Sequence, residues 1–225
     1  MGGTPWPGAQ SGSGNEMGPA GVAGGMKIAV IGTGNVGRSI GNKWHQAGYD
    51  VVFGTRSASG TEARSASSRD PDNAPVVGIG DALAGADVVL LALPGQAAAE
   101  VIAAQSAALA GKTVIDAVNR IGQSEVNCRS LLADAVPDAR YVRAFNTLGW
   151  ENFADPVPGT SLFFVADAGA RYLAEELIAA VGLEPAYVGD AGAAGTVDAL
   201  VPLWFALVKQ HGGNRRIALA IVTSG

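Results

Sequence analysis

The sequence predicts an α/β protein with a Rossmann-type, doubly wound, mostly parallel sheet, followed by a small helical C-terminal region. Short apolar runs rich in β-branched residues recur along the chain, as is typical of strands buried on both faces. Stretches with helical periodicity separate these runs. The first run, Lys27 to Ile31, leads directly into a glycine turn, a helix and a second strand, Asp50 to Phe53, which together have the length of one βαβ unit.

The glycine turn carries Gly32, Gly34 and Gly37, which have the spacing G-x-G-x-x-G. In a dinucleotide site the first glycine permits a tight turn, the second lets a pyrophosphate approach the backbone, and the third lets the helix pack on the strand. A helix beginning near Asn35 directs unpaired N–H groups and its positive dipole end at the same place. Because glycine makes up 32 of the 225 residues, the spacing alone is a weak signal, and the strand before it and the helix after it carry the prediction. The alternative is that the glycines only tighten a strand-to-helix turn.

The end of the second predicted strand indicates which dinucleotide is bound. An NAD enzyme places Asp or Glu there to bind the ribose hydroxyls, whereas this chain has Gly54-Thr55-Arg56-Ser57. Arg56 offers a planar fork to an adenosine 2′-phosphate, and the Thr55 and Ser57 hydroxyls are further donors, so NADP(H) is favoured. Arg64 is a second candidate contact in the following loop. The alternative is that Arg56 is a solvated loop charge.

Composition excludes several classes of function. A net charge of −5 without a basic, aromatic-rich cluster argues against a nucleic-acid partner. The single cysteine, Cys128, cannot form an intramolecular disulfide, and no His/Cys cluster is spaced to bind a metal, so a reducing cytoplasm is expected. No run reaches the roughly 20 continuous apolar residues of a membrane span, so no membrane partner is expected.

The chain divides into three predicted parts. Residues 1–25 are rich in Gly, Pro and Ser and are expected to be a disordered extension; residues 26–190 are the NADP-binding domain, and residues 191–225 a helical region that closes the cleft. Further strands are expected at 76–79, 87–93, 112–116, 141–145, 161–166 and 185–188, and helices at 61–68, 96–109, 125–135, 171–181 and 196–210.

Candidate ligand contacts follow the predicted strands, because ligands of open α/β sheets lie at the carboxyl ends of the strands. Leu93 and Pro94 follow the fourth strand, although a proline that merely starts a helix fits equally well. Asn119 follows the fifth strand, and Asn146-Thr147-Leu148 follow the sixth. Asp116 is instead expected to accept hydrogen bonds from nearby backbone N–H groups.

Five segments together resemble a known family: GTGNVG, GTRS, LALP, AFNTLGWENFADP and GDAGAAGTVDALVPLWFALVKQHGG. They are similar to the NADPH-dependent oxidoreductases of the deazaflavin coenzyme F420. The resemblance implies a Rossmann domain that holds NADP and a direct hydride transfer between the nicotinamide and the deazaflavin ring. It implies that Thr33 to Val36 contact the pyrophosphate and that Thr55 and Arg56 contact the 2′-phosphate. It also implies that the nicotinamide and deazaflavin are lined by Leu93, Pro94, Asn146, Thr147 and Leu148.

No set of catalytic side chains can be assembled from the sequence, since His45 and His211 are better explained as helix residues. Hydride transfer between two stacked cofactors needs orientation and a dry slot more than it needs an acid or base. Two alternatives stay open: an NADPH-dependent reductase of flavin or of a small carbonyl or imine, with Thr147 as the plausible hydroxyl donor, and a non-enzymatic NADP(H) sensor. The motifs also resemble the NADPH domains of ferric reductases that pass electrons to flavin. The apolar helix at 196–210, kinked by Pro202, is expected to wall the acceptor slot and to pair with a second copy in a homodimer.

Overall fold

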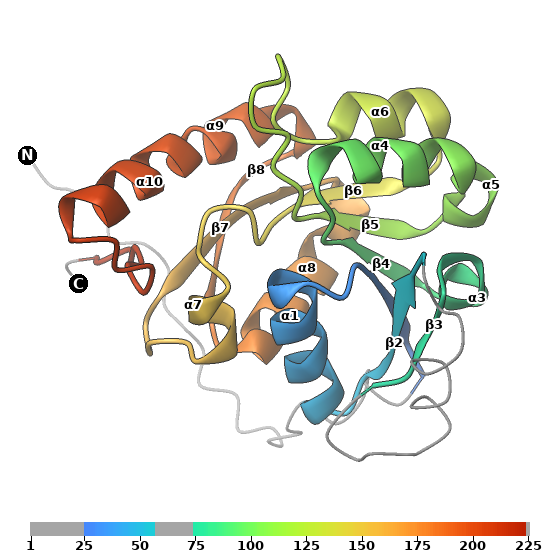
Figure 1. Cartoon of the computed structure of the whole chain (residues 1–225), viewed down its shortest axis with the longest axis horizontal. Coiled ribbons are helices and arrows are strands. Elements are labelled where there is room, and N and C mark those ends of the chain that lie inside the picture. The colour runs from blue at the N-terminus through green and yellow to red at the C-terminus, as the bar shows by residue number, and fades with distance from the viewer. Residues whose placement is uncertain (1–24, 57–73, 224–225) are drawn as a thin grey trace, which may run out of the picture.

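The structure, a computed structural model, describes residues 25–56 and 74–223. Two expectations fall outside the described residues. They are the disorder of residues 1–25, of which only Gly25 is described, and the helix at 61–68. The same holds for two candidate phosphate contacts, Ser57 and Arg64. The described chain has helices on both faces of one central sheet, which confirms the predicted Rossmann-type fold (Figure 1).

Within the described residues the sheet has eight strands, in the order β3-β2-β1-β4-β5-β6-β7-β8. All neighbouring strands are parallel except β6 and β7, which are antiparallel. The chain runs outward from β1 to β3 and then crosses to β4 on the other side of β1, so the topological switch point lies between β1 and β4. The strands are β1 (Lys27–Ile31), β2 (Asp50–Thr55), β3 (Val76–Gly78), β4 (Val88–Leu91), β5 (Thr113–Asp116), β6 (Arg140–Arg143), β7 (Ser161–Ala166) and β8 (Glu184–Gly189).

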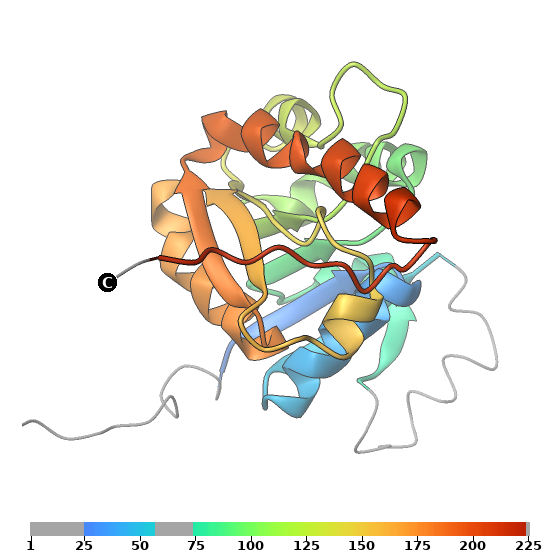
Figure 2. The same ribbon diagram turned by 90° about the vertical axis from the view of Figure 1, so that its left-hand side faces the viewer.

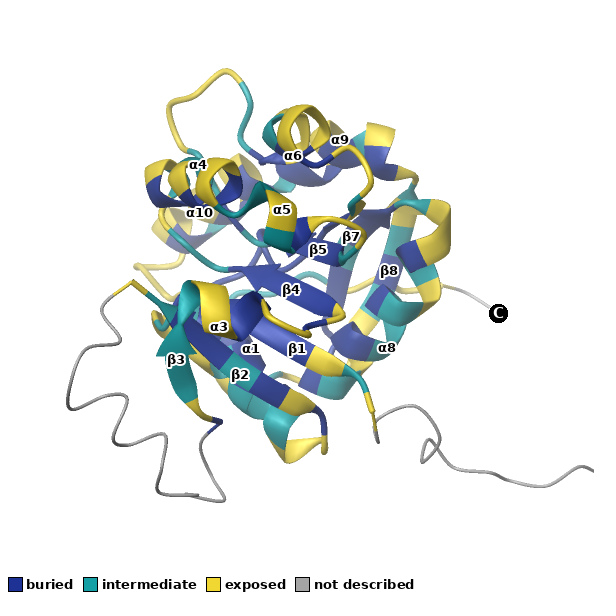
Figure 3. Ribbon diagram, turned by 90° about the vertical axis from the view of Figure 1, so that its right-hand side faces the viewer, coloured by how far each residue is buried: buried dark blue, intermediate teal, exposed yellow. Residues whose placement is uncertain are grey.

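Two helical layers cover the sheet (Figures 1 and 3). Helices α1, α7 and α8 contribute to one apolar cluster, and α3, α4, α5, α6 and α9 contribute to the cluster on the opposite face. The helices are α1 (Asn35–Gln46), α3 (Ile79–Leu83), α4 (Gly95–Ala104), α5 (Ser106–Leu109), α6 (Arg129–Ala135), α7 (Glu151–Ala154), α8 (Arg171–Val181), α9 (Ala194–Asp198) and α10 (Leu200–Gln210), with short 3-10 turns η1 (Ala168–Ala170) and η2 (Ala191–Ala193).

Strand β1 shows why the sequence gives this layering. Ile28 and Val30 belong to the cluster under α1, whereas Ala29 and Ile31 belong to the cluster under α3 and α4, and all four are fully buried (Figure 3). Successive side chains of a strand point to opposite faces, so a strand covered on both sides must be apolar throughout.

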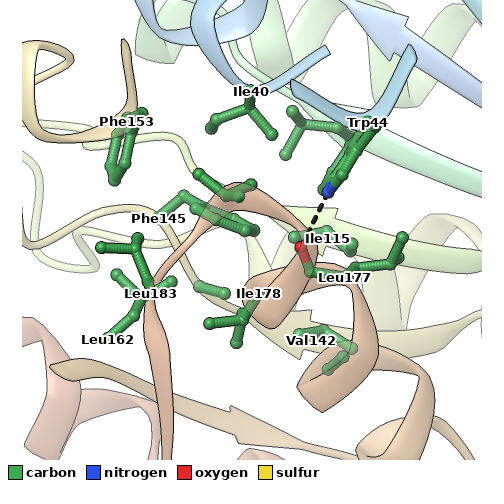
Figure 4. Packing of buried hydrophobic residues seen from close by; sticks show 14 of the residues in the cluster. Ile40, Trp44, Ile115, Val142, Phe145, Phe153, Leu162, Leu177, Ile178 and Leu183 are labelled. Carbon is green, nitrogen blue, oxygen red and sulfur yellow. Dashed lines mark hydrogen bonds between the residues drawn. The ribbon is translucent and has the colours of Figure 1, made fainter. Parts of the chain in front are cut away.

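Aromatic side chains fasten α1 to the loop that follows β6 (Figure 4). The Trp44 and Phe145 rings meet edge to face with centroids 5.9 Å apart, and Phe145 meets Phe153 in the same way at 5.6 Å. The Trp44 indole Nε1 donates a hydrogen bond of 2.8 Å to the Leu177 carbonyl, which satisfies its polar atom within the core. Phe145 is thereby held at the point where the chain leaves the sheet.

Three predicted boundaries are wrong. Strand β6 ends at Arg143, before the expected end at residue 145, because Phe145 adopts a positive φ of 62° that turns the chain away from the sheet. Helix α6 begins at Arg129 rather than at residue 125, because the N–H of Cys128 donates to Asp116 Oδ2 (2.6 Å) and the N–H of Arg129 donates to Asn127 Oδ1 (2.8 Å). The expected helix at 96–109 is interrupted at Gln105 and forms α4 and α5.

The single C-terminal helix expected at 196–210, with a kink at Pro202, is divided into two helices in the structure. The helical stretch starts at η2 and is interrupted at Ala199, between α9 and α10, rather than at the proline. Pro202 lacks the N–H that would bond to the carbonyl four residues before it, that of Asp198, and its ring crowds that carbonyl, so a proline interrupts a helix about one turn before itself. The interruption that Pro202 predicts is therefore present, but it lies at Ala199.

The stretch Ala191–Gln210 is long and apolar enough, by length and composition alone, to cross a membrane, with a mean hydropathy of 1.6. This corrects the expectation that no segment would reach that length. Asp198, in the middle of the stretch, is paired with the buried Arg143 of β6, so the stretch packs on the domain.

The chain after α10 runs back across the molecule beside β7 (Figure 2). The Ser161 N–H donates to the Leu219 carbonyl (2.9 Å), and the Trp204 Nε1 donates to the Ile217 carbonyl (2.9 Å). Arg215 Nε lies 2.8 Å from Glu151 Oε1 on α7. This C-terminal segment thus ties α10 to α7 and β7.

Candidate functional site

The turn after β1 has the geometry that its glycine spacing predicts. Gly32 has a φ of 119°, and a Cβ placed on it would lie 2.2 Å from the Ala92 carbonyl oxygen. A Cβ on Gly37 would lie 2.1 Å from the Gly32 carbonyl oxygen. Only glycine fits at these two positions, where the turn is tight and the helix meets the strand.

Gly34 is different, because packing within the protein does not explain it. Its φ of −75° suits any residue, and a Cβ built on it would meet no atom within 4 Å. The residue is exposed and caps α1, whose first residue is Asn35, and no side chain caps the helix N-terminus. Open space in front of free backbone N–H groups is what a pyrophosphate requires, so the turn fits a bound dinucleotide.

Thr33 and Val36 flank this open face. Both are half-buried, and the Thr33 carbonyl accepts a 2.8 Å hydrogen bond from Arg38 Nε, which fastens the turn to the first helical turn. Val36 also lines a small cavity at the carboxyl ends of the neighbouring strands, which is described below as the aromatic slot. Thr33, Gly34, Asn35 and Val36 are therefore all at least partly exposed beside the switch point, whereas Gly32 is buried.

The carboxyl end of β2 carries Thr55 and Arg56, as predicted. The Arg56 side chain is 66% exposed, and its Nη1 lies 3.5 Å from Oε2 of Glu100, whose side chain is 57% exposed. The sequence around Arg56 holds no acidic residue, but the fold brings this carboxylate to it from α4. The expectation that no carboxylate would stand near the phosphate position is therefore wrong.

Two cavities lie along the carboxyl ends of β4, β5 and β6. The first, which we call the α4 cavity, has a volume of about 540 Å³ and lies between the start of α4 and the loop after β5; it is lined by Pro94, Gly95, Gln96, Ala99, Asn119, Arg120, Ile121 and Gln123. The second, which we call the aromatic slot, has a volume of about 150 Å³ and is lined by Val36, Ala117, Asn119, Phe145, Asn146, Thr147, Leu148, Trp150, Val201, Trp204, Phe205 and Arg215.

Most predicted slot residues meet in these cavities. Asn146, Thr147 and Leu148 line the aromatic slot, Pro94 lines the α4 cavity, and Asn119 borders both. Leu93 lines neither cavity; its Cδ2 would lie 3.3 Å from a Cβ on Gly32, so it packs against the glycine turn.

A buried polar network that the sequence did not predict lies beneath the aromatic slot. Arg143, at the end of β6, is fully buried, and its Nη2 lies 2.6 Å from Oδ1 of Asp198 on α9. The same Nη2 donates to Asn119 Oδ1 (2.8 Å), while Asn119 Nδ2 donates to the Asn146 carbonyl (2.8 Å). The sequence does carry one signal for this pair, because Arg143 and Asp198 are opposite charges that each lie among apolar residues, in YVRAF and TVDALV. Asn119, predicted to face the cofactor, has both amide atoms bonded inside the protein.

Asp116 has the structural role that was predicted for it. Its Oδ1 accepts from the Val118 N–H (3.0 Å), and its Oδ2 accepts from the Cys128 N–H (2.6 Å) and the Tyr141 hydroxyl (2.9 Å). Burial raises the pKa of the Asp116 carboxyl, and the nearby Arg143 guanidinium and these donors oppose that rise. Asp116 therefore holds the loop after β5 in place.

The two histidines lie away from these cavities. His45 is in the last turn of α1, and His211 caps α10. Among residues 25–56 and 74–223, no three His, Cys, Asp or Glu side chains are grouped to hold a metal ion.

Residues 27–120 match the family model described as NADP oxidoreductase, coenzyme F420-dependent. A solved structure from Arthrobacter sp. FB24, whose description proposes an F420-dependent NADP reductase, is 26% identical, with a TM-score of 0.73 over 88% of this chain and 100% of that one. A hypothetical protein from Sinorhizobium meliloti is also 26% identical, with a TM-score of 0.64 over 88% of this chain and 96% of that one.

A curated relative, the metalloreductase STEAP3 of Rattus norvegicus, is 25% identical over 189 residues, which are 79% of this chain. The match spans only 38% of the relative's length. The comparisons confirm the family resemblance of the nucleotide-binding part, and they show that the chain shares its Rossmann-type fold with a solved structure of similar length.

Proposed function

We propose that this protein transfers a hydride between NADP(H) and the deazaflavin coenzyme F420. The observation that carries the proposal is the arrangement of the glycine turn and the aromatic slot along one sheet edge. Val36 belongs to both, since it follows the open face of Gly34 and lines the slot. A dinucleotide whose pyrophosphate lies on the turn can therefore extend its nicotinamide end toward the slot.

The adenosine end of the nucleotide would lie beside the end of β2. The exposed Arg56 guanidinium there can bind a 2′-phosphate through two parallel N–H donors. The segment Gly54-Thr55-Arg56 has no carboxylate of its own to bind the ribose hydroxyls, which is the usual recognition of NAD. NADP(H) is therefore the proposed nucleotide.

The walls of the aromatic slot suit a flat ring and a dry reaction. Phe145, Trp150 and Trp204 supply aromatic surface, and Val201 and Phe205 bring α10 against the same space. NADP(H) would supply the hydride, and the proton that completes the reduced deazaflavin can come from solvent at the ring edge. The protein must therefore orient two rings and keep water from the carbon that receives the hydride, which needs no side-chain acid or base. In this proposal α10 and the segment after it close the cleft, as the sequence predicts for residues 191–225.

A flavin is the second candidate acceptor. The resemblance of the motifs to the NADPH domains of ferric reductases that pass electrons to flavin favours it, and the relative STEAP3 is named a metalloreductase, although that match covers a minor part of the relative. Reduction of a carbonyl or imine would also need a proton donor; Thr147 offers a hydroxyl at the slot and is only 5% exposed. The remaining alternative is an NADP(H) sensor without turnover.

Stopped-flow absorbance separates these candidates. The protein is mixed with NADPH and, in parallel, with F420, with FMN or FAD, and with a cyclic imine. We expect rapid NADPH oxidation with F420 and background rates with the others. Fast oxidation by a flavin or imine alone would replace F420 by that acceptor, and tight NADPH binding without oxidation by any of them would identify a sensor.

A further inference from the structure

We propose that Arg143 and Asp198 are positioning residues that turn the Asn146 side chain so that its amide oxygen, rather than its NH2 group, receives the carboxamide N–H of the nicotinamide. The inference rests on the proposed function, because it requires the nicotinamide end of NADP(H) to enter the aromatic slot. It concerns two residues that line neither cavity and that act on the ligand through a third.

The ion pair connects the sheet to the C-terminal helices. Arg143 is the last residue of β6, and Asp198 is the last residue of α9. Arg143 Nε and Nη2 both donate to Asp198 Oδ1, at 2.8 and 2.6 Å, and Asn127 Nδ2 donates to the other oxygen, Oδ2, at 2.7 Å. Both oxygens of the carboxylate are therefore occupied by donors, which fixes its orientation.

This fixed carboxylate decides which way the Asn146 amide faces. An ionised carboxylate can only accept hydrogen bonds, so Asn146 must present its NH2 group to it, and Asn146 Nδ2 donates to Asp198 Oδ1 at 3.1 Å. A flipped amide would place its oxygen against the carboxylate. The guanidinium of Arg143 imposes the opposite choice on Asn119, whose oxygen accepts from Arg143 Nη2.

The consequence is an unpaired acceptor at the slot. Asn146 is 4% exposed and lines the aromatic slot, and its Oδ1 is buried without a hydrogen-bond partner among the described residues. Buried polar atoms are nearly always paired, so an exception in a ligand cavity points to a partner supplied by the ligand. Phe145, with its positive φ and its ring packed between Trp44 and Phe153, holds the preceding peptide in place.

The chemistry of the missing partner is a hydrogen-bond donor on a flat ring. Nicotinamide carries such a donor in its carboxamide NH2 group. The 3-acetylpyridine analogue of NADP replaces this NH2 group by a methyl group and keeps the rest of the nucleotide. The pair of ligands therefore isolates the one hydrogen bond in question.

The test is calorimetric binding of NADP, its acetylpyridine analogue and 2′,5′-ADP to the full chain and to three variants. Asn146→Ala removes the acceptor, and Asp198→Asn removes the charge that orients it. Tyr141→Phe is the matched control, because it deletes a hydrogen bond to Asp116 in the same buried cluster without touching Asn146. The fragment 2′,5′-ADP lacks the nicotinamide and reports on the adenosine end alone.

We expect the unchanged protein and Tyr141→Phe to bind NADP about three- to tenfold more tightly than the analogue, as one hydrogen bond allows. The ratio should fall to about one in Asn146→Ala and should shrink in Asp198→Asn, with 2′,5′-ADP binding unchanged throughout. An unaltered ratio in Asn146→Ala or in a folded Asp198→Asn would overturn the inference, as would an equal loss in Tyr141→Phe. Failure of the unchanged protein to bind 2′,5′-ADP would instead contradict the proposed function. Should Asp198→Asn not fold, Asn127→Ala, which removes the donor that holds Asp198 Oδ2, takes its place in the test, and the ratio should shrink there too.

Discussion

Replacing Glu100 by Gln should tighten the binding of NADPH. In the structure Glu100 Oε2 stands 3.5 Å from Arg56 Nη1, at the place proposed for the adenosine 2′-phosphate. The carboxylate competes with that phosphate for the guanidinium and also repels it. Glutamine keeps the size of the side chain and removes both effects, whereas the affinity for NADH, which has no 2′-phosphate, should hardly change.

The expected gain in NADPH binding is small and can be estimated from the geometry. Two unit charges 3.5 Å apart in water attract each other by about 1.2 kcal/mol. Both side chains are more than half exposed, so salt and side-chain mobility reduce this to about 0.2–1 kcal/mol, the usual range for surface pairs. The gain in affinity is therefore about 1.4- to fivefold, and it should shrink at about 1 M salt.

Isothermal titration of NADPH and NADH into Glu100→Gln, Arg56→Gln and the double variant measures this effect. Arg56→Gln alone should weaken NADPH binding by about tenfold or more, since a charge-assisted hydrogen bond contributes roughly 1.5–3 kcal/mol. In the double variant the part of the gain that comes from competition for Arg56 should disappear, and only the part that comes from repulsion of the phosphate should stay. A loss of NADPH affinity in Glu100→Gln would refute the reasoning, because it would mean that the carboxylate assists the nucleotide.

Three further predictions follow from other parts of the structure. Gly34→Val should abolish measurable NADPH binding and keep the fold, since the new side chain would point into open space. Gly37→Ala should instead lower the free energy of unfolding by on the order of 1–3 kcal/mol, because its Cβ would lie 2.1 Å from the Gly32 carbonyl oxygen. Thermal denaturation measures the stability of both variants, and calorimetry measures their NADPH binding. The Cys128 thiol is fully buried, and burial raises its pKa. It should therefore stay unreactive toward a thiol reagent at neutral pH until the protein is unfolded. Reaction at the rate of a free thiol would contradict its burial. Homodimerisation through α10 stays a prediction, and Leu203, which is 46% exposed on that helix, is the residue to change. Leu203→Glu should lower the mass that light scattering measures at micromolar concentration. A monomeric mass for the unchanged protein would exclude the dimer.

The parts of the fold that local sequence encodes were the parts that could be predicted. The β1 strand, the positive φ of Gly32 and the close packing at Gly37 follow from residue type and spacing. Pro202 indicates the interruption of the C-terminal helix as well, although the break lies at Ala199, about one turn before the proline.

The interactions that could not be predicted join residues far apart in the chain. Arg143 and Asp198 are 55 residues apart, and Glu100 reaches Arg56 only because the α4 helix follows a strand on the other side of the switch point. Periodicity and spacing report on local structure, so they cannot indicate which charges meet across a sheet. The candidate residues along the sheet edge could therefore be named from the sequence, whereas the groups that orient Asn146 came from the structure alone.

The central claim is a direct transfer of hydride from NADPH to a deazaflavin in the aromatic slot. It is tested most directly by a single turnover with NADPH that carries deuterium at the transferring position, followed by mass spectrometry of the reduced F420. Deuterium from one of the two faces of the nicotinamide should appear in the reduced deazaflavin without loss to water. Reduced F420 that carries no deuterium from either face, or no reduction of F420 at all, would contradict the claim.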